Sequence, residues 1–237
     1  MNCINRTNTL AIVPARGGSK RLRRKNLYPL LGKPMIQYSL DILKKLADNV
    51  TPFISTEDEE IFQYCLNQGF SMPYRRPKNL AEDDTSIIDV ILDTVNWYES
   101  KKNLFFEVIV LLQPTSPDRC IEDVIKGLSK FKEDINKSVV SIQPMLEHPE
   151  ECISIESNGS WTPLLGKYPE NHNSQNFSNN YYFIDGSIYI ASVNHLRNFK
   201  SFIVPKKTNF LFLDKRWPVD IDFLEDLRIA EAIMKKS

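Results

Sequence analysis

The sequence has neither an excess of charge nor a long apolar run. Its 237 residues include 30 Lys or Arg and 30 Asp or Glu, so the formal net charge at pH 7 is +0. A balanced chain has no overall field that would draw it to nucleic acid or to an anionic membrane, so any recognition of phosphate must be local. No apolar run approaches the length required to span a bilayer. We therefore expect neither a nucleic-acid partner nor a membrane partner.

Cysteine is scarce, and several familiar motifs are missing. Cys3, Cys65, Cys120 and Cys152 lie far apart, without the spacings that bind zinc. Cys65 falls among core-type residues, which favours free thiols in a reducing compartment over disulfides. The first residues (MNCINRTNT) have no signal-peptide core, and we expect a cytoplasmic protein. Neither the Walker A pattern nor GxGxxG occurs, which argues against a Rossmann-type dehydrogenase.

Apolar runs that are typical of strands alternate with segments of helical periodicity. The runs are 9–14, 50–55, 106–114, 138–143 and 186–191, and helices are expected to begin near Pro34, Thr56, Ser86, Ile121 and Phe223. Thr56–Glu59 and Ser86–Asp89 each have the capping-box pattern that begins a helix. The alternation predicts a single α/β domain over 1–237, with a Rossmann-like, doubly wound and mainly parallel sheet.

The sequence also predicts the buried faces of two helices and one irregular segment. Ile125 is expected on the buried side of the fourth helix, and Phe223 on the apolar face of the last one. The alternation stops at 145–183, which is rich in Asn, Pro and Ser and contains an Asn158–Gly159 turn between two short strand-like pieces. We interpret 145–183 as an insertion rather than an independent domain.

The most informative stretch is AIVPARGGSKRLRRKN at 11–26. A buried strand leads into a loop with two adjacent glycines, Gly17 and Gly18, and six basic residues. Ligands of open α/β sheets bind beyond the carboxyl ends of strands, and glycine lets backbone N–H groups approach a phosphate closely. A basic run can also be simply a solvated loop. Its place directly behind the first strand favours phosphate binding.

Two further polar groups follow apolar strands. Gln113 ends the most apolar run, where it either caps the turn made with Pro114 and Pro117 or contacts a ligand. Asp220 and Asp222 alternate in extended backbone, so both carboxylates can face one cation. The same aspartates could instead cap the last helix, Asp222 especially.

Six segments in order resemble the CMP-sialic acid synthetase (acylneuraminate cytidylyltransferase) family. The basic loop resembles its A-R-x-x-S-K-x-x-x-x-K-N signature, and LLQPTSPDR at 111–119 matches L-L-Q-P-T-S-P-x-R almost letter for letter. The other four are ISTED at 54–58, RRPKNLAEDDTS at 75–86, GSIYI at 186–190 and VDIDFLEDL at 219–227. The resemblance covers nearly the whole chain. It implies the fold of nucleotide-diphospho-sugar transferases and the transfer of CMP from CTP to an acidic nine-carbon sugar, with release of pyrophosphate.

The resemblance also implies roles for individual residues. Arg16, Lys25 and Gln113 are the expected catalytic residues, with Lys25 stabilising charge on the α-phosphate. Arg76 corresponds to a residue near the cytosine and ribose, whereas Arg75 is expected to be a surface charge. Asp220 and Asp222 would bind Mg²⁺. The nucleotide-binding set is Ala15, Arg16, Gly17, Ser19, Lys20, Lys25, Asn26, Arg76 and Ser86, and the sugar-binding set is Gln113, Ser116, Gln175, Phe183 and Asp185.

The sequence departs from the family near the expected sugar site. Members that act on sialic acid carry R-x-N-G before the I-Y-I strand, whereas this chain has Phe183 and Asp185 before Gly186, and Gln175 stands where an arginine is common. Loss of cationic partners should change how the sugar is held. A legionaminate- or pseudaminate-like sugar therefore joins sialic acid as a candidate substrate. The segment 145–183 corresponds to the one that pairs two subunits in the family, so the resemblance implies a homodimer.

Two alternatives stay open at this point. One is a cytidylyltransferase for 3-deoxy-octulosonate or a methylerythritol-type alcohol. The other is a regulatory module that binds nucleotide without catalysis, against which the presence of Lys25, Gln113, Asp220 and Asp222 argues.

Overall fold

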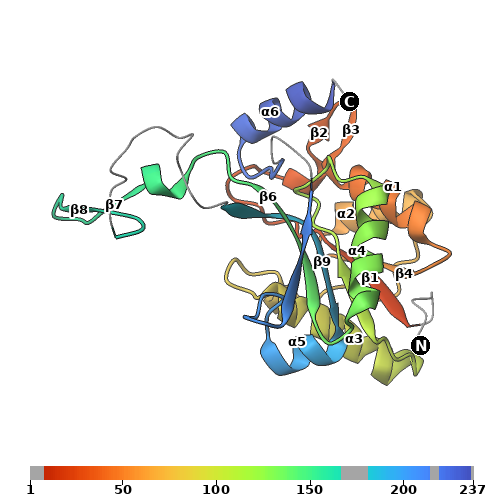
Figure 1. The fold of residues 1–237 in the computed structure, drawn as a ribbon. Helices are drawn as coiled ribbons and strands as arrows, with labels where there is room; N and C mark the ends of the chain where they lie inside the picture. Colours follow the sequence, from red (N-terminus) through yellow and green to blue (C-terminus); the bar gives the residue numbers. More distant parts are fainter. Residues whose placement is uncertain (1–7, 167–180, 214–218, 236–237) are drawn as a thin grey trace.

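A computed structural model describes residues 8–166, 181–213 and 219–235. Its centre is a six-stranded sheet in the order β10-β6-β9-β5-β1-β4 (Figure 1). The strands are β1 (Thr9–Pro14), β4 (Thr51–Ser55), β5 (Val108–Leu111), β6 (Ser138–Pro144), β9 (Tyr182–Ser192) and β10 (Thr208–Phe212). Within the described ranges, no helix combines the length and the apolarity that crossing a bilayer demands.

The sheet is mainly parallel, as the alternation predicted. β4, β1 and β5 pair in parallel, and so do β6 and β10. β9 runs antiparallel to both of its neighbours, β5 and β6. The fold class is therefore confirmed as mixed α/β, with one reversed strand at the centre.

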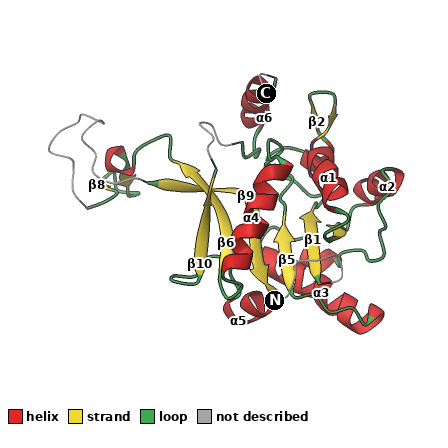
Figure 2. Cartoon of the chain, turned by 45° about the vertical axis from the view of Figure 1, so that its right-hand side comes forward, coloured by secondary structure: helices red, strands yellow, loops and turns green. Residues whose placement is uncertain are grey.

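Helices cover both faces of the sheet, which is the doubly wound arrangement (Figure 2). On one face α1 (Met35–Leu46), α2 (Glu59–Asn67) and α4 (Ile121–Glu133) contribute to a single apolar cluster with the strands. On the other face α3 (Ile87–Lys102) and α5 (Val193–Phe199) contribute to a second cluster. Parallel strands buried on both faces are near-continuous in apolar residues, which explains the strong strand signal in the sequence.

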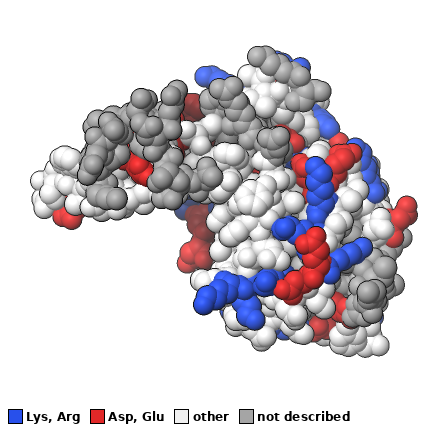
Figure 3. All heavy atoms as spheres, viewed as in Figure 1, with Lys and Arg blue, Asp and Glu red and all other residues white. Residues whose placement is uncertain are grey.

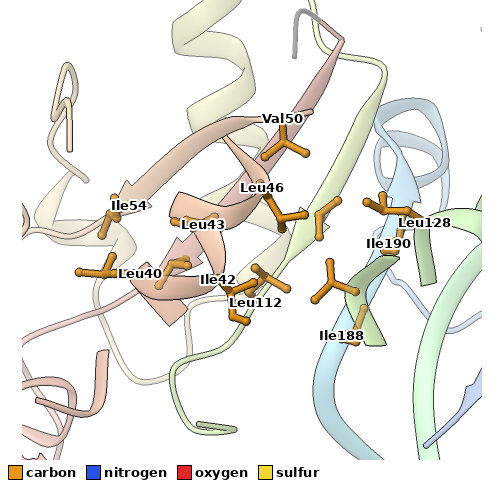
Figure 4. Packing of buried hydrophobic residues seen from close by; sticks show 14 of the residues in the cluster. Leu40, Ile42, Leu43, Leu46, Val50, Ile54, Leu112, Leu128, Ile188 and Ile190 are labelled. Carbon is orange, nitrogen blue, oxygen red and sulfur yellow. The ribbon is translucent and has the colours of Figure 1, made fainter. Parts of the chain in front are cut away.

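The core over β1 and β5 is built by α1. Leu40, Leu43 and Leu46 of this helix are almost completely buried and lie over the sheet, near Ile54 of β4 and Leu112 just after β5 (Figure 4). Burial of a Leu side chain contributes about 1.5–3 kcal/mol. Because β1 and β5 pair directly in parallel beneath this core, the two loops that follow them leave the same edge of the sheet from adjacent strands.

Two small hairpins and the last helix lie outside the main sheet. β2 (Pro29–Leu30) and β3 (Lys33–Pro34) form one hairpin, and α6 (Leu224–Met234) packs against it through a satellite apolar cluster that includes Leu30 and Leu227. β7 (Ile153–Ile155) and β8 (Trp161–Pro163) form the other hairpin around the predicted Asn158–Gly159 turn. This second hairpin projects from the body beyond β6 (Figure 1).

Three local predictions were wrong. The N-cap of α2 is Asp58, whose carboxylate accepts the N–H of Ile61, and not Thr56. Ile125 is 52% exposed, because α4 turns Val124 and Leu128 towards the sheet instead. Phe223 precedes α6 and is 49% exposed, since the contact of this helix with the body is made by Leu227 and Ala230.

Candidate nucleotide site

A hollow of about 460 Å³ lies beyond the carboxyl ends of β1 and β5, where an open α/β sheet binds its ligands. The basic loop forms one wall, the segment after β5 forms another, and the segment around Asp83 closes the third side. Eight residues of the expected site line it: Arg16, Ser19, Lys20, Lys25, Asn26, Arg76, Gln113 and Asp222.

Every cation of the loop that lines the hollow is paired with a carboxylate. Asp83 bridges Arg16 (2.8 Å between Nη1 and Oδ1) and Lys20. Asp222 bridges Lys25 (2.7 Å between Nζ and Oδ1) and Arg21. The hydrogen bond from Lys20, followed by the charges of Lys20 and Arg16, holds the pKa of Asp83 below its usual value. Elsewhere on the surface, too, basic and acidic side chains are interspersed, as the face shown in Figure 3 illustrates.

Lys25 is the most enclosed of these cations. Its side chain is 15% exposed, compared with 81% for Lys20. It begins a short 3₁₀ turn, Lys25–Leu27, that follows Arg24 in the left-handed conformation. Asn26 in the same turn donates from Nδ2 to the carbonyl of Arg16 at 2.8 Å and so ties the two ends of the loop together. The loop is thus a braced structure with an inward-facing ammonium group.

Arg76 forms the floor of the hollow and is only 6% exposed. Its Nε donates to Oγ of Ser55 at 2.9 Å, and its Nη2 donates to the carbonyl of Ser55 at 2.6 Å. Burial lowers the pKa of Arg76 to about 10, partly offset by the charge of Glu57, so the guanidinium stays protonated at neutral pH. Arg75, by contrast, lies at the surface, as predicted, and there it pairs with Glu59.

Gln113 is packed against the reversed strand β9. Gly186 has φ +73°, and a Cβ on it would lie 3.2 Å from Oε1 of Gln113 and 3.9 Å from Oγ of Ser116. The backbone carbonyl of Gln113 accepts from Arg119, which also donates to the carbonyl of Ser187 at 2.6 Å. Burial lowers the pKa of Arg119 to about 10, which still leaves it charged at neutral pH. Gln113 is therefore fixed between β5 and β9, with its side chain at the edge of the hollow.

The structure does not bring all of the expected sugar-binding residues to the hollow. Ser116 is buried, and its Oγ lies 3.5 Å from the carbonyl of Asp185. Asp185 is also buried, and its Oδ1 accepts from Ser141 and from the N–H of Ser187, so this oxygen braces the β6–β9 pair. Phe183 is 46% exposed on β9, opposite Gln143 of β6. Gln175 lies outside the described residues.

Three residues of the expected nucleotide-binding set lie behind the hollow. Ala15 is buried, and its N–H donates to the carbonyl of Ser55 at 2.9 Å. The N–H of Gly17 donates to Glu57 at 2.8 Å. Ser86 is the N-cap of α3, where its Oγ accepts from the N–H of Ile88, and its neighbour Thr85 lines the hollow in its place.

Asp220 and Asp222 lie beside the loop, and their environments differ. Burial acts to raise the pKa of Asp222, but the hydrogen bond from Lys25 and the charges of Lys25 and Arg21 outweigh it and hold that pKa below its usual value. Asp220 is exposed on one side, yet desolvation on its other sides raises its pKa, and the charge of Asp222 adds to the rise. A hydrogen bond from Thr115 opposes this rise. Before α6 it is Asp226 that accepts the N–H groups of Asp222 and Phe223, and the N-cap of the helix is Phe223 rather than Asp222.

Comparison with known proteins identifies the family. The family model described as cytidylyltransferase matches residues 10–160, which span the basic loop, Arg76, Gln113 and β6. The chain belongs to the cytidylyltransferase family. A CMP-N,N'-diacetyllegionaminic acid synthase of Legionella pneumophila is 33% identical over 95% of this chain and 96% of its own length. A pseudaminic acid cytidylyltransferase of Campylobacter jejuni is 28% identical over 95% and 96%.

Other relatives of this cytidylyltransferase are longer, or similar in fold alone. An N-acylneuraminate cytidylyltransferase of Streptococcus agalactiae is 29% identical over 92% of this chain but only 51% of its own length. A CMP:2-keto-3-deoxy-manno-octonic acid synthetase structure complexed with CTP has a TM-score of 0.69 at 17% identity and covers 97% of this chain and 99% of that one. A 4-diphosphocytidyl-2C-methyl-D-erythritol synthase of Anaerococcus prevotii has a TM-score of 0.63 at 13% identity, covering 96% of each chain.

Sequence reasoning missed three residues that hold the cytidylyltransferase site together. Arg119 closes the LLQPTSPDR segment, and its burial could have been suspected from a charge so close to an apolar strand. Thr115 holds the Asp220 segment, since its carbonyl accepts the N–H of Ile221 at 2.9 Å. Asp83 lies in a run of three acidic residues, 82–84, within which the sequence does not distinguish it from its neighbours.

Proposed function

We propose that the protein transfers CMP from CTP to the anomeric oxygen of an acidic nine-carbon sugar and releases pyrophosphate. The observation that carries this proposal is the hollow in which Arg16, Lys20 and Lys25 of the cytidylyltransferase signature lie together at the carboxyl ends of β1 and β5. Three cations match a triphosphate, and a partly enclosed ammonium group such as that of Lys25 can stabilise charge that develops on the α-phosphate.

The position of each residue in the hollow suggests its role in the proposed reaction. Arg16 and Lys20 would exchange Asp83 for the outer phosphates, and Lys25 would exchange Asp222 for the α-phosphate. Gln113, at the opposite edge, would orient the sugar so that its 2-hydroxyl oxygen attacks the α-phosphorus in line with the departing pyrophosphate. The bond to the sugar oxygen forms as the bond to pyrophosphate breaks, and the hydroxyl proton passes to water.

The two aspartates have the chemistry of a Mg²⁺ site. Asp222 lines the hollow, Asp220 is two residues away, and their mutual repulsion raises the pKa of Asp220 in addition to the effect of desolvation. A divalent cation would relieve that repulsion, and Mg²⁺ requires few protein carboxylates when substrate phosphates supply other ligands. When bound, the cation would neutralise charge on the phosphates. Asp220 and Asp222 are therefore the proposed ligands.

Among nine-carbon sugars we favour a legionaminate- or pseudaminate-like substrate over sialic acid. The supporting observations are Phe183 and Asp185 in place of the arginine and asparagine of members that act on sialic acid, and the similarity to enzymes named for legionaminic and pseudaminic acids. Eight-carbon octulosonate stays the alternative, supported by likeness of fold.

A pyrophosphate-release assay tests both parts of this proposal. Purified protein is incubated with CTP, Mg²⁺ and one sugar from a panel of legionaminate, pseudaminate, N-acetylneuraminate and 3-deoxy-octulosonate. We expect kcat/KM for a diacetamido sugar to exceed that for N-acetylneuraminate by about tenfold, the amount that one altered polar contact accounts for. Binding of CTP with no turnover on any acidic sugar would instead favour the non-catalytic nucleotide-binding module.

We also propose that 145–183 forms a homodimer interface. The β7–β8 hairpin leaves the body and exposes Ile153, Ile155, Trp161 and Leu164, which are 44–66% exposed. Contiguous exposed apolar side chains of this size mark interaction surfaces. Light scattering should give twice the 27.5 kDa chain mass for the wild type and the single mass for Ile155→Asp combined with Trp161→Asp. A wild-type protein that is already monomeric would refute the interface.

A further inference from the structure

Glu57 lies directly behind the basic loop and has no role in the chemistry proposed above. It follows β4, between the fully buried Thr56 and Asp58, which caps α2. Its Oε1 accepts the backbone N–H of Gly17 at 2.8 Å. The hydrogen bond spans 40 residues of sequence and joins the loop to the segment between β4 and α2.

Gly17 of the loop lies so close to Asp58, the N-cap of α2, that a side chain at this position would clash. A Cβ on Gly17 would lie 2.3 Å from Oδ2 of Asp58 and 2.8 Å from its Cβ, which no side chain tolerates. Asp58 is itself fixed, because its Oδ1 accepts the N–H of Ile61 at 2.9 Å. The close approach of Gly17 to Asp58 is what allows its N–H to reach Glu57.

The two oxygens of the Glu57 carboxylate differ in their surroundings, since only Oε1 accepts a hydrogen bond from a residue that the structure describes. Its Oε2 is buried and has no hydrogen-bond partner within the described part of the chain. The charge of the carboxylate acts on the buried guanidinium of Arg76 at the floor of the hollow. Buried polar atoms in native proteins nearly always have a hydrogen-bond partner, so this oxygen calls for an explanation.

We propose that Glu57 is a positioning residue for CTP binding, since it holds the N–H of Gly17 and so fixes the turn from which Arg16, Ser19 and Lys20 reach the hollow. A loop ordered before the nucleotide arrives loses less conformational entropy on binding. Neither Glu57 nor Gly17 lines the hollow, so their hydrogen bond should act on affinity for CTP through the shape of the loop and not on the bond-making step. This inference rests on the proposed binding of CTP at the loop.

Glu57→Ala, Glu57→Gln and a control, Glu59→Gln, test the assignment. Glu59 is exposed at the start of the same helix and pairs with Arg75 outside the hollow. We measure the Kd for CTP by calorimetry, kcat and KM for CTP by pyrophosphate release, and Tm. Glu57→Ala should weaken CTP binding and raise its KM about tenfold, the value of one hydrogen bond, with kcat within about threefold of the wild type.

Glu57→Gln keeps an acceptor at the same place and should recover most of the affinity, while Glu59→Gln should match the wild type. Tighter CTP binding by Glu57→Ala would show that the carboxylate competes with phosphate. Equal losses of CTP affinity in Glu57→Ala and Glu57→Gln would show that the charge matters and not the hydrogen bond. Either result overturns the assignment. If Glu57→Ala does not fold, a tenfold weaker Kd in folded Glu57→Gln overturns it. Absence of CTP binding by the wild type would refute the proposed function instead.

Discussion

Replacement of Lys25 by Ala should lower the rate of pyrophosphate release by about 10²–10³-fold, the usual effect of removing one preorganised group that stabilises developing charge. Its ammonium group is the most enclosed cation of the loop, with 15% of the side chain exposed. A fixed charge in a partly water-excluded site loses little to solvent screening. The loss should appear in kcat as well as in kcat/KM, because the charge on the α-phosphate develops in the transition state.

Arg23→Ala is the matched control for Lys25→Ala. Arg23 is an exposed residue of the same loop and does not line the hollow. Its removal changes the net charge by the same amount and should leave turnover within about twofold of the wild type, as surface substitutions generally do. The far-ultraviolet circular dichroism of both variants should match that of the wild type. Near-normal turnover by Lys25→Ala would remove the assignment of the triphosphate contact.

Asp220→Asn and Asp222→Asn should both lose more than about 10²-fold in turnover, because a metal ion contributes several kcal/mol of charge stabilisation. Their effects on stability without metal should be opposite. Asp222 is paired with Lys25 and Arg21, so its neutralisation should lower Tm. Asp220 is desolvated and repelled by Asp222, so its neutralisation should raise Tm. Differential scanning calorimetry in EDTA measures both changes.

The pH dependence of stability follows from the pKa shifts of Asp220 and Asp222. The folded-state pKa of Asp222 is depressed, so its stabilising contribution is present above the unfolded-state pKa and is lost as pH falls through the folded-state value. The folded-state pKa of Asp220 is raised, so its ionisation destabilises the metal-free fold as pH rises through the acidic range. Asp222→Asn should therefore flatten the acid side of the Tm profile. A fall in Tm for Asp220→Asn at neutral pH would contradict the proposed repulsion.

The sequence predicts the fold class, and most of the residues it singles out for nucleotide binding line one hollow, because both depend on local patterns. Buried parallel strands are continuously apolar, and the loop that follows β1 holds its basic residues within ten positions, 16–25. The parallel direction of the strands determines where these loops meet, since parallel strands bring their carboxyl ends to one edge of the sheet. Arg16, Lys25 and Gln113 therefore meet although nearly a hundred residues separate the first from the last.

What the sequence does not predict depends on contacts between distant segments. The choice of Asp58 over Thr56 as the cap of α2 follows from where β4 ends, and the burial of Asp185 follows from the pairing of β6 with β9. The antiparallel direction of β9 likewise cannot be predicted from a run of apolar residues, because the run is the same in either direction. Asp83 and Glu57 contact the loop across 40 or more positions, and no local pattern distinguishes them from surface acids.

Each loop cation that lines the hollow already has a carboxylate beside it, so a triphosphate that binds there as proposed would have to replace these carboxylates as partners of the cations. The net binding free energy of a nucleotide is then the difference between the interaction of the cations with its phosphates and their interaction with the aspartates it displaces. A triphosphate can displace Asp83 and Asp222 together, whereas a monophosphate reaches one of them. With the proposed reaction, the arrangement should discriminate by the number of phosphates, so that a CMP-sugar product, with one phosphate, is held less tightly than CTP.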